Sequence, residues 1–183
     1  MREQLFKFRP IYLLFVGFLL FFSMTGCSLA PKTPSPKISA KWKAELERNR
    51  VLMAEPNPRL SPDQVVKIQL GALKNNDRED RGIEVTFKFA SPSNRRFTGP
   101  VQRFGRMIKS SYSLMLKYES VEYDPVKIVG DQALQRVRLF DTRGNAIVYV
   151  FILSKQHEGD CAGCWMTDGV TVERIIPMTR ESA

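Results

Sequence analysis

Two cysteines near the end of the chain are the residues best placed by type and spacing to do chemistry. Cys161 and Cys164 are separated by Ala162 and Gly163. A pair at this spacing can form a disulfide, act as a redox pair, or give two thiolates to a zinc ion. The chain has one further cysteine, Cys27. If Cys27 is modified, Cys161 and Cys164 carry the remaining thiols of the chain.

The neighbouring residues separate these alternatives. Haem attachment needs a histidine directly after the second cysteine, where Trp165 stands. A thioredoxin-type pair needs its first cysteine at a helix N-terminus, whereas this pair follows a polar loop and leads into a predicted strand. Zinc would have only His157 and Asp160 to add to the two sulfurs, which is a thin ligand set. We expect a structural disulfide, no metal and no cofactor, with redox and zinc roles as the alternatives.

The acid–base candidates do not form a catalytic pattern. Asp141 falls in a predicted hairpin turn, Tyr149 lies on a predicted strand, and His157 sits in a polar loop. No spacing among them requires a shared site. We therefore predict no catalytic residues and a protein that is not an enzyme.

The N-terminal segment has the pattern of an export signal. A net positive stretch at 1–10 precedes an almost wholly apolar run at 11–22, which is shorter than the roughly 20 residues of a membrane span. The sequence Met-Thr-Gly-Cys at 24–27 resembles the bacterial lipoprotein signal, which implies lipidation of Cys27. Ser28 after the cysteine points to the outer membrane, facing the periplasm. The alternatives are an uncleaved signal anchor and cleavage after Ala30, where the following proline is unfavourable.

The rest of the chain predicts helices followed by strands. The composition predicts a helix at 41–54. A capping box at Ser61 and Gln64 predicts the start of a second helix, and a third helix is expected at 100–110. Residues 83–89 alternate in polarity, which favours a strand, although a short helix also fits. Strands are expected at 119–123, 126–129, 134–140, 146–153, 164–167 and 170–176, with turns at 141–144 and 168–169. The continuous apolar run at 146–153 predicts a central strand covered on both faces.

These elements predict an α+β fold in which N-terminal helices pack on a curved antiparallel sheet of about four strands. The expected organisation is a signal peptide at 1–26, the lipidated cysteine and a proline-rich tether at 27–40, a helix and linker at 41–60, the α+β domain at 61–177 and a tail at 178–183.

Several short motifs resemble an uncharacterised domain family that groups with the nuclear transport factor 2-like, cystatin-like folds. They are Gln-Leu-x-Ala-Leu at 69–73, Phe-x-Phe-Ala-Ser-Pro-x-Asn at 87–94, Arg-Phe-x-x-Met-Ile at 103–108, Gln-x-Val-x-Leu-x-Asp-x-x-Gly at 135–144 and Cys-Trp-Met-x-Asp-Gly-Val at 164–170. The resemblance covers about residues 61–176 and implies a cone-shaped fold in which 83–90 is helical. It brings no catalytic residues with it.

Folds of this shape often hold a cavity between the helices and the sheet. The large side chains that could line or fill it are Phe87, Phe89, Phe104, Met107, Tyr112, Tyr149, Phe151 and Trp165. Packing of the core is the competing explanation for them, since a domain of this size needs its aromatic residues there.

The chain carries a formal net charge of +9, which favours anionic partners weakly. Five of its cations lie close together in the sequence and could contact an anionic surface or simply face solvent: Arg95, Arg96, Arg103, Arg106 and Lys109. An export signal and the lack of a binding motif argue against nucleic acid.

The sequence predicts a non-catalytic interaction or scaffold module, anchored to the membrane by an N-terminal lipid, with a possible envelope protein partner. The alternative is a binding protein for a small hydrophobic or anionic ligand. A thiol–disulfide enzyme or another enzyme is the less favoured third choice.

The mass of the intact protein extracted from cell envelopes tests the predicted lipidation of Cys27 and the predicted disulfide together. We expect an N-terminal peptide that begins at an acylated Cys27, and a gain of two hydrogen atoms on reduction. An unmodified Met1 with free thiols would contradict both predictions.

Overall fold

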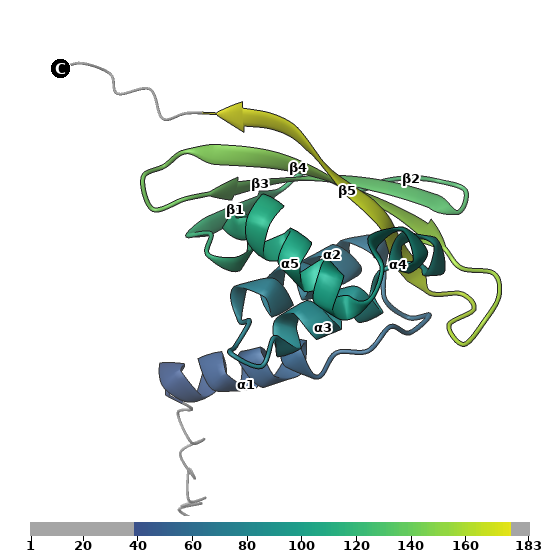
Figure 1. The fold of residues 1–183 in the computed structure, drawn as a ribbon, viewed down its shortest axis with the longest axis horizontal. Helices are drawn as coiled ribbons and strands as arrows, with labels where there is room; N and C mark the ends of the chain where they lie inside the picture. Colours follow the sequence, from purple (N-terminus) through teal and green to yellow (C-terminus); the bar gives the residue numbers. More distant parts are fainter. Residues whose placement is uncertain (1–38, 177–183) are drawn as a thin grey trace, which may run out of the picture. The chain divides into compact units, whose positions relative to one another are not determined.

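A layer of helices packs on one face of an antiparallel sheet (Figure 1). The computed structural model describes residues 39–176, so the predicted signal peptide, Cys27, the tether up to residue 38 and the tail at 178–183 lie outside the described residues. The helices are α1 (Ala40–Leu52), α2 (Pro62–Lys74), α3 (Arg81–Lys88), α4 (Pro92–Thr98) and α5 (Val101–Ser111), followed by the short 3-10 helix η1 (Ser113–Leu116). The helices predicted at 41–54, from Ser61 and at 100–110 are confirmed as α1, α2 and α5.

Within residues 39–176 the sheet has five strands, because the segments expected as separate strands at 164–167 and 170–176 form one. They are β1 (Ser120–Tyr123), β2 (Lys127–Val129), β3 (Gln132–Phe140), β4 (Ala146–Lys155) and β5 (Trp165–Ile176). The order is β1-β3-β4-β5, with β2 pairing alongside β3, and every pairing is antiparallel. The predicted α+β class, with helices packed on a curved sheet, is confirmed.

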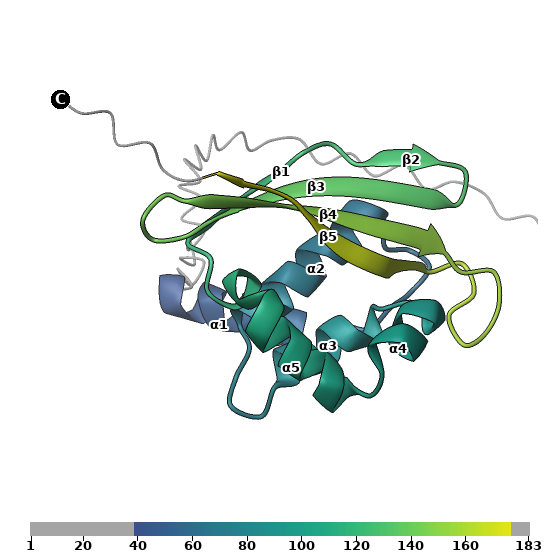
Figure 2. The same cartoon turned by 45° about the horizontal axis from the view of Figure 1, so that its top comes forward.

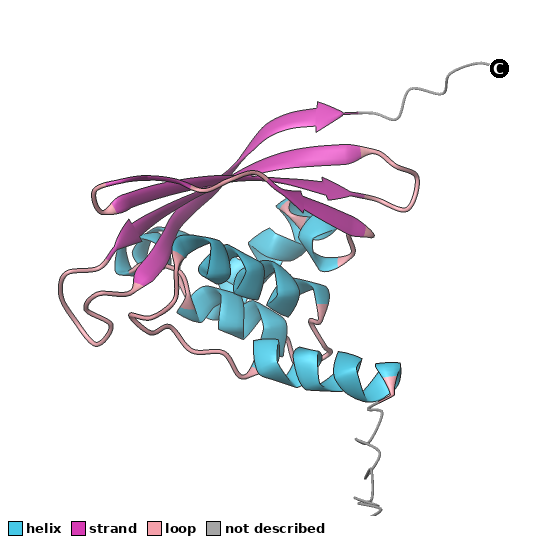
Figure 3. Ribbon diagram, turned by 180° about the vertical axis from the view of Figure 1, so that it is seen from behind, coloured by secondary structure: helices cyan, strands magenta, loops and turns pink. Residues whose placement is uncertain are grey.

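Among residues 39–176, the helices cover only one face of the sheet (Figure 3). The face toward the helices carries buried side chains such as Val137, Leu139 and Phe151. On the opposite face Arg136 reaches Glu173 across β4 at 2.8 Å, and Arg138 pairs with Glu122. The prediction that the strand at 146–153 is covered on both faces is therefore wrong, although β4 is central. The side chains of β4 that point away from the helices lie beneath long charged side chains of the neighbouring strands, not beneath a second layer of helices.

Helix α3 replaces the strand that the alternation at 83–89 predicted, and the implication of the family resemblance is confirmed. The helix packs against α1, α2 and α5, so Ile83 and Val85 are both buried although they point in different directions. Arg81, Glu84 and Lys88 form the exposed side of the helix, so its buried face is wide enough to include both residues. Gly82 permits the close packing, since a Cβ atom there would lie 2.1 Å from the carbonyl oxygen of Ala72 on α2.

The segment from Trp165 to Ile176 is one strand, so the predicted turn at 168–169 is wrong. The pairing of β4 with β5 shifts register between Ile152 and Leu153, whose partners are Gly169 and Thr167. Asp168 is therefore the extra residue of a β-bulge. Bulges redirect side chains and occur often beside functional sites. Helix α4 is an element that the sequence analysis did not predict.

Replacing Gly82 with alanine tests the close contact of α2 and α3. We expect Gly82→Ala to lower the free energy of unfolding by about 1–3 kcal/mol, because the methyl group meets backbone that cannot give way. Gly105→Ala on α5 is the matched control, since its methyl group would meet Ile83 Cγ2 at an ordinary 3.4 Å. The control should be neutral or gain up to about 1 kcal/mol from helix propensity. Equal urea midpoints for the two variants would contradict this account.

Candidate ligand-binding cavity

A cavity of about 180 Å³ opens between the helices and the first half of β5. Figure 2 shows α4 lying beside this part of β5, with α5 and α2 further along the same face. The lining residues are Gln69 and Leu73 of α2; Thr86 of α3; Ala90; Asn94, Phe97 and Thr98 of α4; Phe104, Met107 and Ile108 of α5; Tyr112 and Met115; Phe151 of β4; and Thr167, Asp168, Gly169 and Val170 of β5.

Three buried polar side chains form a hydrogen-bonded cluster at the cavity. Thr167 donates its hydroxyl to Gln69 Oε1 at 2.7 Å. Gln69 in turn donates from Nε2 to the carbonyl oxygen of Thr86, in the last turn of α3, at 3.2 Å. The Thr86 hydroxyl donates to the carbonyl of Gly82 at 2.9 Å. Each side chain therefore already has a partner within the protein, as burial requires.

The backbone of Thr167 fixes α4 at the other side of the cavity. Its carbonyl accepts from the backbone N–H of Ser91 at 2.9 Å and from Asn94 Nδ2 at 3.0 Å, and its own N–H donates to the carbonyl of Phe89. Ser91 also caps α4, because its hydroxyl accepts from the N–H of Asn94. This one residue of β5 thus positions the start of α4 and, through its side chain, α2.

The remaining wall is largely apolar and aromatic. Four of the eight predicted pocket residues line it, namely Phe104, Met107, Tyr112 and Phe151. Tyr112 is held in place by donating its hydroxyl to the carbonyl of Val170 at 3.0 Å. Phe97 belongs to the lining while 84% of its surface is exposed, so it stands at the rim.

The other four predicted pocket residues lie outside the lining. Phe89 is completely buried in the core, and the Phe87 ring packs 5.3 Å from the ring of Phe104. Trp165 is partly buried against the core at the start of β5. Tyr149 is buried too, and burial, with a smaller contribution from Tyr112, raises its pKa to about 12. Its phenol is therefore neutral at neutral pH and is not available as a base.

The predicted basic cluster does not gather at the cavity. Lys109 Nζ lies 2.6 Å from Asp80 Oδ2, and Arg106 lines a separate groove with Lys109, Glu79 and Glu84. Arg95 lines another groove that also holds Lys88. Arg96 and Arg103 are exposed, and neither belongs to the lining of the cavity.

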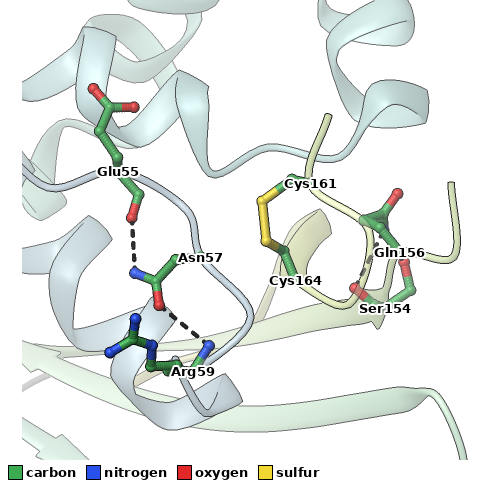
Figure 4. Close-up of a disulfide and its surroundings, with 7 residues drawn as sticks. All are labelled: Glu55, Asn57, Arg59, Ser154, Gln156, Cys161 and Cys164. Atoms are coloured by element: carbon green, nitrogen blue, oxygen red, sulfur yellow. Dashed lines mark hydrogen bonds between the residues drawn. A yellow bond between two sulfur atoms is a disulfide. The ribbon is translucent and has the colours of Figure 1, made fainter. Parts of the chain in front are cut away.

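Cys161 and Cys164 are joined by a disulfide (Figure 4). Cys164 is fully buried, and the loop closes through hydrogen bonds between Gln156 and both Gly163 and Cys164. The loop packs against the linker between α1 and α2, since a Cβ atom at Gly163 would lie 3.3 Å from the Pro58 side chain. The disulfide therefore anchors the start of β5, three residues before Thr167 of the cavity.

The other chemical candidates have structural partners. His157 Nε2 lies 3.1 Å from Asp131 Oδ2, while the two sulfurs are bonded to each other. Asp141 holds the β3–β4 turn by accepting from the backbone N–H groups of Arg143 and Asn145. A hydrogen bond from the Asn145 side chain is the main reason that the pKa of Asp141 is lowered. Among residues 39–176 no group of three His, Cys, Asp or Glu side chains is arranged to hold a metal ion.

Sequence reasoning missed the polar half of the cavity. Gln69 lies on a helix that was predicted from its capping box, and Thr86 lies in the segment whose alternation favoured a strand. Thr167 and Asp168 were assigned to a strand end and a turn. The signal that could have found them is the Asp-Gly pair inside an otherwise β-rich segment, because an interrupted strand can contain a bulge as well as a turn.

The chain folds as an α+β domain in which helices cover one face of an antiparallel sheet. An open, mainly apolar cavity lies between the two layers. The chain belongs to the family described as Domain of unknown function (DUF4864), whose model matches residues 59–177. Comparison with curated proteins and with solved structures gives no match.

Removing one hydroxyl tests whether the polar cluster holds the cavity together. We expect Thr167→Val to lower the free energy of unfolding by about 1–3 kcal/mol, because Gln69 Oε1 is left buried without its donor. Thr171→Val, an exposed position on the same strand, is the control and should change stability by less than about 0.5 kcal/mol. Urea unfolding measures both variants, and a harmless Thr167→Val would show that the cluster is dispensable.

Proposed function

We propose that this chain is a lipid-anchored protein of the bacterial cell envelope whose folded domain binds a small, largely apolar molecule without chemically changing it. The observation that carries the proposal is the open cavity between the helices and β5. Protein interiors are normally close-packed, with few voids larger than a water molecule. Concave, mainly apolar sites with a few placed polar groups are typical of ligand-binding sites.

The state of the lining residues supports binding. Gln69, Thr86 and Thr167 already satisfy one another, so the buried polar floor does not require an elaborate polar ligand. Phe104, Met107, Ile108 and Phe151 offer apolar contact surface instead. The preferred ligand is therefore mainly apolar, and its affinity comes from burial of that surface.

A non-catalytic role fits the side chains around the cavity. Catalysis by acid and base needs a titratable pair within hydrogen-bond reach of the reacting atoms. The only titratable side chains among the lining residues are Asp168 and Tyr112, and the Tyr112 hydroxyl donates to a backbone carbonyl. The predicted absence of enzymatic activity remains part of this proposal.

The envelope location is supported by the N-terminal pattern and by the cysteines. Disulfides persist in oxidising compartments such as the periplasm, and the Cys161–Cys164 bond is consistent with export. The same proposal includes lipidation at Cys27, the outer membrane facing the periplasm, and kinship with the nuclear transport factor 2-like folds. Within residues 39–176 no helix is long and apolar enough to cross a membrane.

A scaffold or interaction module is the second candidate, and α1 is the observation that favours it. Trp42 and Leu46 on this helix are largely exposed, as is Met53 just after it. Exposed apolar side chains in one segment are typical of protein contacts. This surface is separate from the cavity, so the two functions can be tested independently.

Thermal unfolding with octanol as a neutral apolar probe tests the cavity. We expect the midpoint to rise with probe concentration, as binding to the native state requires. Met107→Trp should abolish the rise, because the larger side chain fills the cavity from α5.

Ser110→Trp, which adds the same side chain at an exposed position of α5, is the control and should respond like the parent protein. If octanol leaves every midpoint unchanged, the binding proposal fails and the interaction module becomes the leading candidate.

A further inference from the structure

Asp168 is the only side chain with a formal charge among the residues that line the cavity. All other lining residues are apolar, aromatic, amide, hydroxyl or glycine residues. Within the described part of the chain, the Asp168 carboxylate makes no ion pair or side-chain hydrogen bond. A partly buried carboxylate beside an apolar cavity retains unused capacity to accept hydrogen bonds.

The backbone pairing of β4 with β5 fixes the position of Asp168. It is the extra residue of the bulge at which Gly169 pairs with Ile152 and Thr167 pairs with Leu153. The residue before it is fixed on three sides, by Gln69, Asn94 and the backbone of Phe89. Asp168 thus follows a backbone position that is held by several hydrogen bonds, and such preorganisation lowers the entropic cost of binding.

A preference of the cavity for cations would run against the net positive charge of the whole chain. The chain has 28 Lys and Arg residues against 19 Asp and Glu residues, so its overall field repels cations. The nearest basic cluster in the sequence, on α4 and α5, does not line the cavity. Phe97, Phe104 and Tyr112 add aromatic surface to the same lining, and aromatic faces attract cations.

We propose that the cavity takes an amine-bearing apolar molecule, with its ammonium group held at the rim by the Asp168 carboxylate and its apolar body inside. This inference rests on the proposed binding function and names the ligand class for the same cavity. It replaces the expectation of an anionic ligand, because the cations that would recognise an anion lie elsewhere.

Three probes with the same eight-carbon chain and different head groups test the proposal: octylammonium, octanol and octanoate. Their affinities for the full chain are measured by calorimetric titration at neutral pH. We expect octylammonium to bind about fivefold more tightly than octanol, and octanoate to bind more weakly than either. Asp168→Asn should remove the advantage of octylammonium and leave octanol binding unchanged.

Asp160→Asn is the matched control, because it makes the same change in net charge at an exposed residue outside the cavity lining. It should preserve the preference, which separates a contact at the rim from the general field of the protein. If octanol binds and octylammonium has no advantage, or if Asp168→Asn leaves the advantage intact, the amine proposal is overturned while the binding function stands. Failure of all three probes to bind would overturn both.

Discussion

The hydrogen bond between Thr167 and Gln69 is the interaction on which the arrangement of the domain depends. Both side chains are 2% exposed, and they join β5 to α2 across 98 residues of sequence. Gln69 then satisfies a carbonyl in the last turn of α3, so one amide connects two helices and a strand. An amide buried without partners would be costly, and the three elements therefore have to meet in this one arrangement.

The same interactions explain why the cavity stays open. A void normally disappears when neighbouring side chains turn into it, but here the polar lining residues are already committed. Tyr112 is bonded to the carbonyl of Val170, Asn94 to that of Thr167, and Thr98 to that of Asn94. Turning any of them inward would break a part-buried hydrogen bond. The cavity is thus preorganised, and a ligand does not have to create it.

Local rules in the sequence predicted most elements, and tertiary packing explains the exceptions. The capping box at Ser61 and the hairpin at 141–144 are short-range signals, and both are present. The alternation at 83–89 misled because the face of α3 that packs on α1, α2 and α5 is wide enough to bury both Ile83 and Val85. The outward face of β4 lies under ion pairs and needs no second layer. Phe104, Met107, Tyr112 and Phe151 were predictable as large side chains near a helix–sheet interface. Gln69, Phe97 and Asp168 were not, because their roles depend on a register shift and on contacts between distant segments.

The order of elements along the chain has a kinetic consequence. In residues 39–176 all five α-helices precede the sheet, and β5, the strand that completes the cavity, is the last of these elements to be synthesised. Contacts between distant residues form slowly, because the chain must first close a large loop. Until β5 pairs with β4, part of the apolar side of α2 lacks its cover, and intermediates with exposed apolar surface are prone to aggregation. A defect in β5 would therefore reduce the yield of folded protein before it altered any property of the mature domain.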